Sequence, residues 1–256
     1  MRPIILAFLS VAAVGAVSLA GLLTLSMSEL RVRRLATFFV SFAVGALLGD
    51  TFIHLVPEIF ADARGPDALR ASLLILAGML LFFIVEKLLR HEHGLLHRHH
   101  HHHEPAARPE LAGVNILGDA IHNYIDGLLI GASWLASPGL GISTTLAVLL
   151  HEIPQELGDF GILIHSGLTV RRATLLNAGS AAIAILGTAT AVVAGAVAHQ
   201  RVIDLLVPVT AGGFVYIAAA DLIPELQHDR TLRALFIQTT LISGGIVVMA
   251  MLTFID

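Results

Sequence analysis

Residues Leu149 to Ile164 read LLHEIPQELGDFGILI, and this stretch decides how the chain folds. It places His151, Glu152, Gln155, Glu156 and Asp159 inside a run that is otherwise apolar. A second run, residues 115–134 (NILGDAIHNYIDGLLIGASW), carries Asn115, Asp119, His122, Asn123 and Asp126 in the same kind of setting. Because ionisable groups are costly in a hydrophobic span, both clusters are candidates for function.

The composition is that of an integral membrane protein. Of the 256 residues, 56% are hydrophobic and 13% are charged, and the mean hydropathy is +0.83. Soluble domains carry about 25% charged residues. No basic stripe with interleaved aromatic residues is present, which excludes a nucleic-acid partner. The chain has no Cys, so it has no thiolate metal site and no cysteine nucleophile.

The apolar runs are long enough for eight transmembrane helices in an all-α protein. We expect a single transport domain over residues 1–256, surrounded by the lipid bilayer, with spans at about 4–25, 35–60, 68–89, 111–135, 141–165, 172–198, 202–226 and 233–254. The first span also has features of a signal peptide, but its apolar length favours a retained helix.

A short internal repeat links the second span to the seventh. Residues 50–58 (DTFIHLVPE) resemble residues 217–225 (IAAADLIPE), with the same Pro-Glu ending. The match predicts a 3+2+3 arrangement in which spans 1–3 and spans 6–8 form an inverted repeat around spans four and five. Such repeats are typical of transporters with a site at mid-membrane.

The basic residues predict the orientation. Eleven of the fifteen Lys and Arg residues fall on the side that holds the 90–110 loop. We therefore expect that loop in the cytoplasm and both termini outside it. The compact, Ala-rich chain favours a bacterial inner or plasma membrane over an organelle membrane. The oligomeric state stays open, with a homodimer as a candidate.

The 90–110 loop is rich in histidine. Neutral imidazoles bind Zn, Cu and Ni, so the loop is a candidate for weak metal capture; the alternative is a solvated low-complexity segment. The residues concerned are His91, His93, His97, His99, His100, His101, His102 and His103.

Helical spacing brings the ligand types together near the centre of spans four and five. His122 and Asp126 share one helix face, as do His151 and Gln155. Imidazole, carboxylate and amide oxygen suit Zn²⁺, and they also accept Fe²⁺, Mn²⁺ or Cd²⁺. The alternative, a polar network that only joins two helices, is costly unless a cation neutralises it. We expect Pro154 to kink the fifth span beside His151.

Further polar residues in the spans are candidates for a pathway. Asp50, His54 and Glu58 follow i, i+4, i+8 and form a stripe that a metal ion or proton could use, although water-facing polar residues would give the same pattern. The remaining pathway candidates are Asp119, Glu156, Asp159 and Asp221.

At HNYIDGLLIGAS (122–133) and HEIPQELGDF (151–160) the chain resembles the ZIP family of divalent metal transporters. The resemblance is to the branch with a HEIPHELGDF-like fifth span and His-rich loops. It implies zinc moved into the cytoplasm by alternating access, with zinc as substrate and without a catalytic cofactor.

The resemblance also implies a metal centre shared between spans four and five. Carried over by position, the main site uses His122, Asp126, His151 and Gln155, and a neighbouring site uses Asn123 and Glu152. Gln155 stands where the branch usually has His, and the sixth span lacks the carboxylate that some members supply.

The rival hypothesis is an intramembrane metal-dependent protease or hydrolase, because His151-Glu152 begins an H-E-x-x-H motif. That chemistry needs a second His four residues on. Gln155 occupies that position, so we expect a transporter and not an enzyme.

Overall fold

The computed structural model describes residues 2–20, 29–61, 63–97, 109–227 and 231–254. Every regular element among these residues is helical. The first half contains α1 (Arg2–Gly15), a 3₁₀ turn (Ala16–Ala20), α3 (Glu29–Gly49), a π segment η2 (Asp50–Leu55), α4 (Val56–Phe60) and α5 (Pro66–His97). The second half contains α6 (Pro109–Ala136), α7 (Pro138–His165), α8 (Val170–Ala181), α9 (Ile183–Tyr216), a π segment η3 (Ile217–Leu222), α10 (Ile223–Leu226) and α11 (Leu232–Leu252).

The described helices follow the predicted spans, with two differences. Helix α5 continues to His97, so the first part of the segment expected as a loop is helical. Its sequence there, EKLLRHEHGLLH, contains good helix formers and no Pro, and the helix continues through Gly94. Helix α9 joins the sixth and seventh spans across a kink at Ala198 (φ −146°, ψ 51°), where the backbone leaves the helical region.

Within the part of the chain that the structure describes, six stretches are long and apolar enough to cross a membrane: Arg2–Leu19, Thr37–Phe60, Pro66–Val85, Val170–Ala198, Ile203–Leu226 and Leu232–Leu252. They correspond to the predicted spans one to three and six to eight. Helices α6 and α7 are 28 residues each but are not among these six. They carry the polar clusters, which lower their hydropathy. The prediction of an all-helical membrane protein is confirmed, and the count of eight spans stays a prediction.

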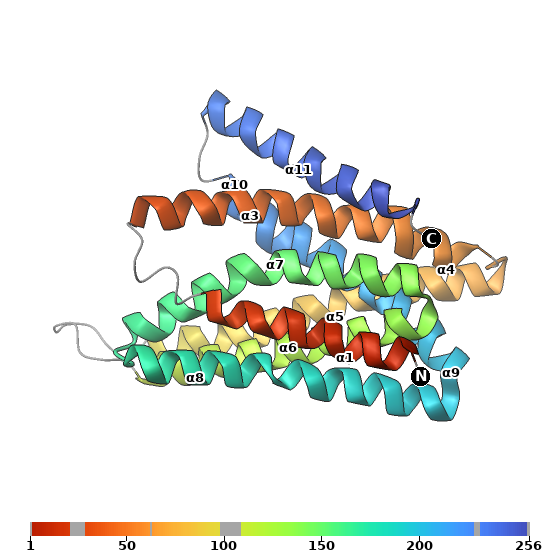
Figure 1. The fold of residues 1–256 in the computed structure, drawn as a ribbon, viewed down its shortest axis with the longest axis horizontal. Coiled ribbons are helices and arrows are strands. Elements are labelled where there is room, and N and C mark those ends of the chain that lie inside the picture. Colours follow the sequence, from red (N-terminus) through yellow and green to blue (C-terminus); the bar gives the residue numbers. More distant parts are fainter. Residues whose placement is uncertain (1, 21–28, 62, 98–108, 228–230, 255–256) are drawn as a thin grey trace.

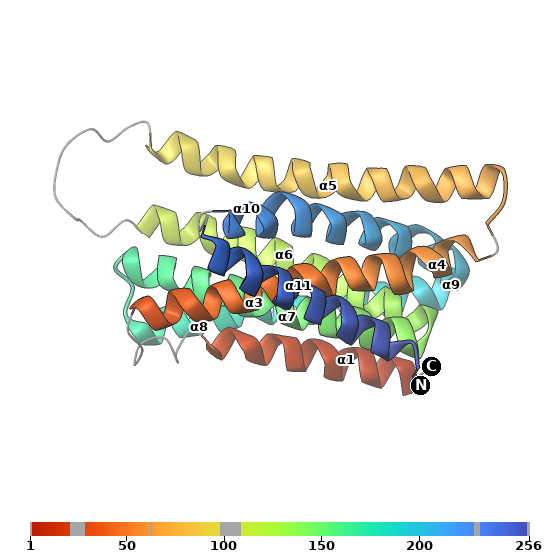
Figure 2. The ribbon, with the colours of Figure 1, turned by 90° about the horizontal axis from the view of Figure 1, so that it is seen from above.

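Helices α6 and α7 pack against each other in the middle of the bundle (Figures 1 and 2). Helices α1, α8 and α9 contact α6, while α3 contacts α7 and α11, and α5 packs on α9. Helix α1 begins and α11 ends at the same end of the bundle (Figure 2). The end of α5 and the start of α6 lie at the opposite end.

The predicted repeat has a counterpart in the local backbone. The π segment η2 is followed by Val56-Pro57-Glu58, and the π segment η3 is followed by Ile223-Pro224-Glu225. π segments are rare and often mark functional sites. The proline ring fits the start of the short helix that follows, because its missing N–H is not needed there. The two matching sequences therefore form the same local structure.

Two pairs of close helix crossings are related by the internal repeat that links spans 1–3 to spans 6–8. An added Cβ on Gly45 would lie 2.0 Å from the carbonyl oxygen of Ile242, and one on Gly212 would lie 2.0 Å from that of Ile75. Gly78 meets the carbonyl of Val209 at 2.3 Å, and Gly245 meets that of Phe42 at 2.4 Å. All four contacts are related by one offset of 167 positions: 42 and 209, 45 and 212, 75 and 242, 78 and 245.

The glycines therefore hold α3 against α11 and α5 against α9 in symmetry-related crossings. Small residues allow this close approach of helices in a membrane. The inverted relation of spans 1–3 and 6–8 is visible in these contacts as well as in the sequence.

We predict that Gly45→Ala and Gly212→Ala lower the thermal midpoint by similar amounts, because each methyl group would overlap a backbone carbonyl. Overpacking of this kind costs about 1–3 kcal/mol. The measurement is thermal unfolding of the purified chain in detergent. Gly179→Ala is the matched control, since a Cβ there meets nothing within 4 Å. Equal midpoints for all three variants would contradict the close crossings.

Candidate metal centre

The most closely packed group of potential metal ligands lies between α6 and α7. Helix α6 supplies His122 and Asp126, which are one turn apart and share a face. Helix α7 supplies the adjacent His151 and Glu152. One ligand atom from each of the four residues lies within 4.8 Å of the others.

We call the four residues His122, Asp126, His151 and Glu152 the metal cluster. The distances between their ligand atoms are short. His151 Nε2 lies 3.2 Å from Asp126 Oδ2 and 3.6 Å from Glu152 Oε1. His122 Nε2 lies 3.3 Å from Glu152 Oε1 and 3.6 Å from Asp126 Oδ2. The two Nε2 atoms are 3.3 Å apart. Both imidazoles thus present the same nitrogen to the same two carboxylates.

Burial and hydrogen bonding leave these atoms available for a cation. Asp126, His151 and Glu152 are each 1% exposed. Apart from the two imidazoles, the described residues provide no hydrogen-bond donor to any of the four carboxylate oxygens of Asp126 and Glu152. His151 Nδ1 lies 3.1 Å from the carbonyl oxygen of Ala147. Donation to that carbonyl leaves a lone pair on Nε2, as in histidines that bind metals.

Two imidazole nitrogens and two carboxylates form a ligand set that suits a borderline divalent ion. The carboxylates balance the ion's charge, so the filled cluster is close to neutral in an apolar surrounding. Without a cation, two buried carboxylates lie next to each other at a large electrostatic cost. The cluster therefore has the chemistry of a candidate cation site.

Gln155 and Asn123, both predicted ligands, lie beside this cluster and face Asp119. Asn123 Nδ2 donates to Asp119 Oδ1 at 2.7 Å, and Gln155 also contacts the Asp119 side chain. The structure thus groups Glu152 with His122, Asp126 and His151, whereas the family resemblance assigned Gln155 to that set. The roles of Gln155 and Asn123 as metal ligands stay predictions.

A second polar group continues from the cluster toward the start of α6 and the end of α7. Asp119 accepts from Ser180, Glu156 accepts from Asn177, and Asp159 Oδ1 accepts from Asn115 Nδ2 at 2.7 Å. Asn177 Nδ2 also donates to the carbonyl oxygen of Ser18, at 3.1 Å. The predicted pathway residues Asp119, Glu156 and Asp159 therefore lie in one polar group. Hydrogen bonds connect this group to α8 and, through Asn177, to the 3₁₀ turn after α1.

Sequence reasoning missed Asn177 and Ser180. Both lie on α8, three residues apart, and are buried. The signal was present, because two polar residues on one helix face in a membrane span predict a partner on a neighbouring helix.

A third polar group lies on the other side of the metal cluster along α7. Asp50, in the π segment η2, is fully buried and accepts from Thr144 Oγ1 at 3.1 Å, while its Oδ1 has no donor among the described residues. His54 Nε2 lies 2.9 Å from the carbonyl oxygen of Met249. Asp221 belongs to η3, but its side chain lies outside the described residues, as do the side chains of the eight loop histidines.

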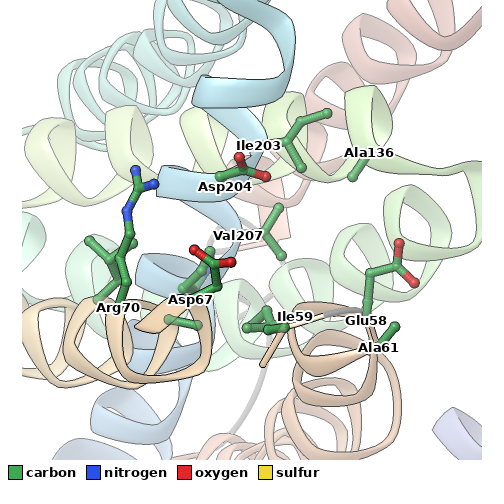
Figure 3. Close-up of a pocket in the computed structure, with 13 residues that line it drawn as sticks. Glu58, Ile59, Ala61, Asp67, Arg70, Ala136, Ile203, Asp204 and Val207 are labelled. Carbon is green, nitrogen blue, oxygen red and sulfur yellow. The ribbon is translucent and has the colours of Figure 1, made fainter. Parts of the chain in front are cut away.

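A mouth pocket of about 360 Å³ opens at the end of the bundle where α4, α5 and α9 meet. Glu58, Asp67 and Asp204 contribute carboxylates from three different segments, and Val207 reaches between them (Figure 3). Arg70 and Ala136 also line it. The sequence did not predict this pocket, because its residues come from distant parts of the chain.

Comparison with known proteins adds several relatives. Human zinc transporter ZIP6 is 45% identical over 119 residues, covering 46% of this chain and 16% of ZIP6. Human zinc transporter SLC39A7 is 38% identical over 149 residues, covering 56% of this chain and 32% of that protein. Mouse zinc transporter ZIP13 is 32% identical over 264 aligned positions, covering 90% of this chain and 73% of ZIP13. The chain thus spans less than a third of ZIP6 and SLC39A7 but most of ZIP13.

The family model described as "ZIP Zinc transporter" matches residues 1–111 and 90–253, which together include nearly the whole chain. The predicted resemblance is therefore confirmed: the chain belongs to the ZIP zinc transporter family.

Proposed function

We propose that this protein carries divalent metal ions, with zinc as the main substrate, across a membrane through the metal cluster between α6 and α7. The observation that carries the proposal is the convergence of His122, Asp126, His151 and Glu152 within 4.8 Å, with the last three buried between α6 and α7. Three related proteins that match this chain are zinc transporters. The ligand set also accepts Fe²⁺, Mn²⁺ and Cd²⁺.

The same cluster is a poor protease site. A zinc protease of the H-E-x-x-H type uses its Glu as general base beside two histidines of one helix. Here Glu152 points its carboxylate at both imidazoles, at 3.3 and 3.6 Å, which makes it a ligand candidate instead of a free base. Gln155, at the position of the second His, faces Asp119. These contacts support a transporter over an enzyme.

A column of polar groups along α7 supports passage through the bundle. Polar side chains of α7 that have polar partners follow one another along the helix. They are Thr144 with Asp50, His151 with Asp126, and Glu156 and Asp159 with their amide partners. The 15 residue-to-residue steps from Thr144 to Asp159 rise about 22 Å, and a bilayer's hydrocarbon core is about 30 Å thick. The column therefore supplies polar side chains over most of the distance that an ion must cross.

We further propose inward transport by alternating access. Eleven of the fifteen basic residues lie on the side of the His-rich segment, which favours a cytoplasmic position for it and external termini. All four cluster residues come from one chain, so the proposed site needs no residue of a second copy. The homodimer and the bacterial membrane stay predictions.

We predict that His151→Ala lowers Zn²⁺ uptake at least about tenfold, because loss of one nitrogen leaves Asp126 and Glu152 with an incomplete ligand set. The measurement is uptake of radioactive Zn²⁺, Fe²⁺ and Mn²⁺ into proteoliposomes. Ser133→Ala, buried on the same helix as Asp126 but outside the cluster, is the control. Unchanged uptake by a correctly inserted His151→Ala variant would refute the proposed site.

A second prediction separates the two ligand sets. If the cluster geometry holds, Glu152→Gln weakens Cd²⁺ binding by about 10- to 100-fold, the size of effect seen on altering metal sites, and Gln155→Ala weakens it less. Calorimetric titration of both variants, in a background with the loop histidines replaced by Ser, measures the difference. A larger loss for Gln155→Ala would favour the set implied by the family resemblance.

The His-rich segment gives a third prediction. Replacing its eight histidines by Ser should change the apparent affinity for Zn²⁺ but leave maximal uptake, because weak capture at the surface only changes the local ion concentration. The concentration dependence of proteoliposome uptake measures both quantities. Loss of maximal uptake in a properly inserted variant would show that these histidines belong to the transport path.

A further inference from the structure

Two carboxylates outside the metal cluster lie one helical turn from its ligands. Asp119 precedes His122 by three residues on α6, and Glu156 follows Glu152 by four residues on α7. Residues at these spacings share a helix face, with their Cβ atoms about 5–6 Å apart. Asp119 is 5% exposed and Glu156 is 1% exposed. Either carboxylate would give the cluster an additional oxygen ligand if its side chain turned that way.

Helix α8 supplies a hydrogen-bond donor to each of these two carboxylates. Ser180 donates to Asp119, which also accepts from Asn123 Nδ2 at 2.7 Å. Glu156 accepts from the amide of Asn177, and this amide is the one donor that the described residues give to the Glu156 side chain. Loss of Ser180 would therefore leave Asp119 with a donor, whereas loss of Asn177 would leave Glu156 without one.

A second contact fixes Asn177 in place. The side chain is buried, and its Nδ2 also donates to the carbonyl oxygen of Ser18, at 3.1 Å, in the 3₁₀ turn after α1. The two N–H groups of the amide thus bind two acceptors, one of which is a backbone oxygen of a different segment. The carboxylate of Glu156 is therefore held toward α8, one turn away from the carboxylate of Glu152.

The number of carboxylates at the cluster affects which ion it prefers. Two imidazole nitrogens and two carboxylates can complete the tetrahedral ligand set that is usual for zinc. A third carboxylate would add an oxygen ligand and a negative charge, and Mn²⁺ favours oxygen-rich octahedral sites. A Glu156 carboxylate that reached the cluster would thus shift the preference from Zn²⁺ toward Mn²⁺.

We propose that Asn177 is a specificity-determining positioning residue, whose amide holds Glu156 on the side of α8 and keeps it out of the ligand set of the metal cluster. Asn177 does not touch the ion and acts through Glu156. The inference rests on the proposed binding of a metal ion at the cluster. It adds a physical reason why two carboxylates, and not three, face the two imidazoles.

The test compares ion preference with and without the Glu156 carboxylate. Calorimetric titration of the full chain in detergent, with the eight loop histidines replaced by Ser, gives the dissociation constants of Zn²⁺ and Mn²⁺. We expect Asn177→Ala to shift the ratio of these constants toward Mn²⁺ by about tenfold, the low end of the effects that partners of metal ligands have on affinity. In a chain that already carries Glu156→Gln, the same Asn177→Ala change should leave the ratio as it is.

The Glu156→Gln background separates positioning from a purely structural role, because the bond from Asn177 to Ser18 is lost in both backgrounds. Asn177→Leu keeps the volume of the side chain without its donors, and it replaces Asn177→Ala if that variant does not fold. Thr174→Ala, on the same helix, is the control that should keep the ratio of the parent chain, since the Thr174 hydroxyl donates to the carbonyl oxygen of Val170. An unchanged ratio in the Asn177 variants, or an equal shift with Glu156→Gln present, would overturn the proposal.

Failure of this inference differs from failure of the proposed function. If the parent chain, with Asn177 intact, binds neither ion, the cluster is no metal site and both proposals fall. If the parent chain binds Zn²⁺, loses it with His151→Ala and keeps its ion preference in the Asn177 variants, only the role of Asn177 is refuted. That second result leaves the transport proposal in place.

Discussion

The structure depends on one electrostatic constraint: two carboxylates and one imidazole are buried between α6 and α7, beside a second imidazole that is partly exposed. Asp126 and Glu152 lie where water cannot stabilise them, and among the described residues only the two imidazoles come close enough to donate to their oxygens. A buried charge of this kind is tolerated only when it is paired. A divalent cation would pair both carboxylates at once and use the imidazole lone pairs, so the contacts that make the empty cluster costly favour the proposed binding of a cation.

The rest of the bundle holds these two helices in a fixed relation. Gly127 of α6 packs so closely on α9 that an added Cβ would lie 1.9 Å from the carbonyl oxygen of Ala184, and Thr188 donates to the carbonyl oxygen of Gly127 at 2.8 Å. The repeated crossings at Gly45 and Gly212 build an equivalent frame on either side. Backbone-to-backbone packing is stiff, because it has no side-chain rotamers to adjust.

The sequence predicted the parts of this arrangement that follow from local pattern. Apolar run length predicted the helices, the Pro-Glu match predicted the repeat, and helical spacing brought His122 to Asp126. It could not predict which residue of α7 turns toward α6, because Glu152 and Gln155 are both polar and the choice depends on how α7 is rotated in the bundle. The sequence also missed Phe214, whose ring packs against His151, because an apolar residue in an apolar span carries no local signal. It missed the mouth pocket because a pocket depends on the meeting of separate helices.

The polar column runs along α7 past the metal cluster, whereas the apolar Phe214 of α9 packs against His151, and this asymmetry has an electrostatic consequence. A metal ion in the cluster cancels the charge of Asp126 and Glu152, so the occupied site is compatible with the apolar neighbour Phe214. The empty site is not, because its net negative charge favours contact with polar groups or water. Occupancy therefore changes which surroundings the cluster prefers. A ligand shifts a conformational equilibrium only by its different affinity for the two states, and here that difference arises from the charge the ion neutralises.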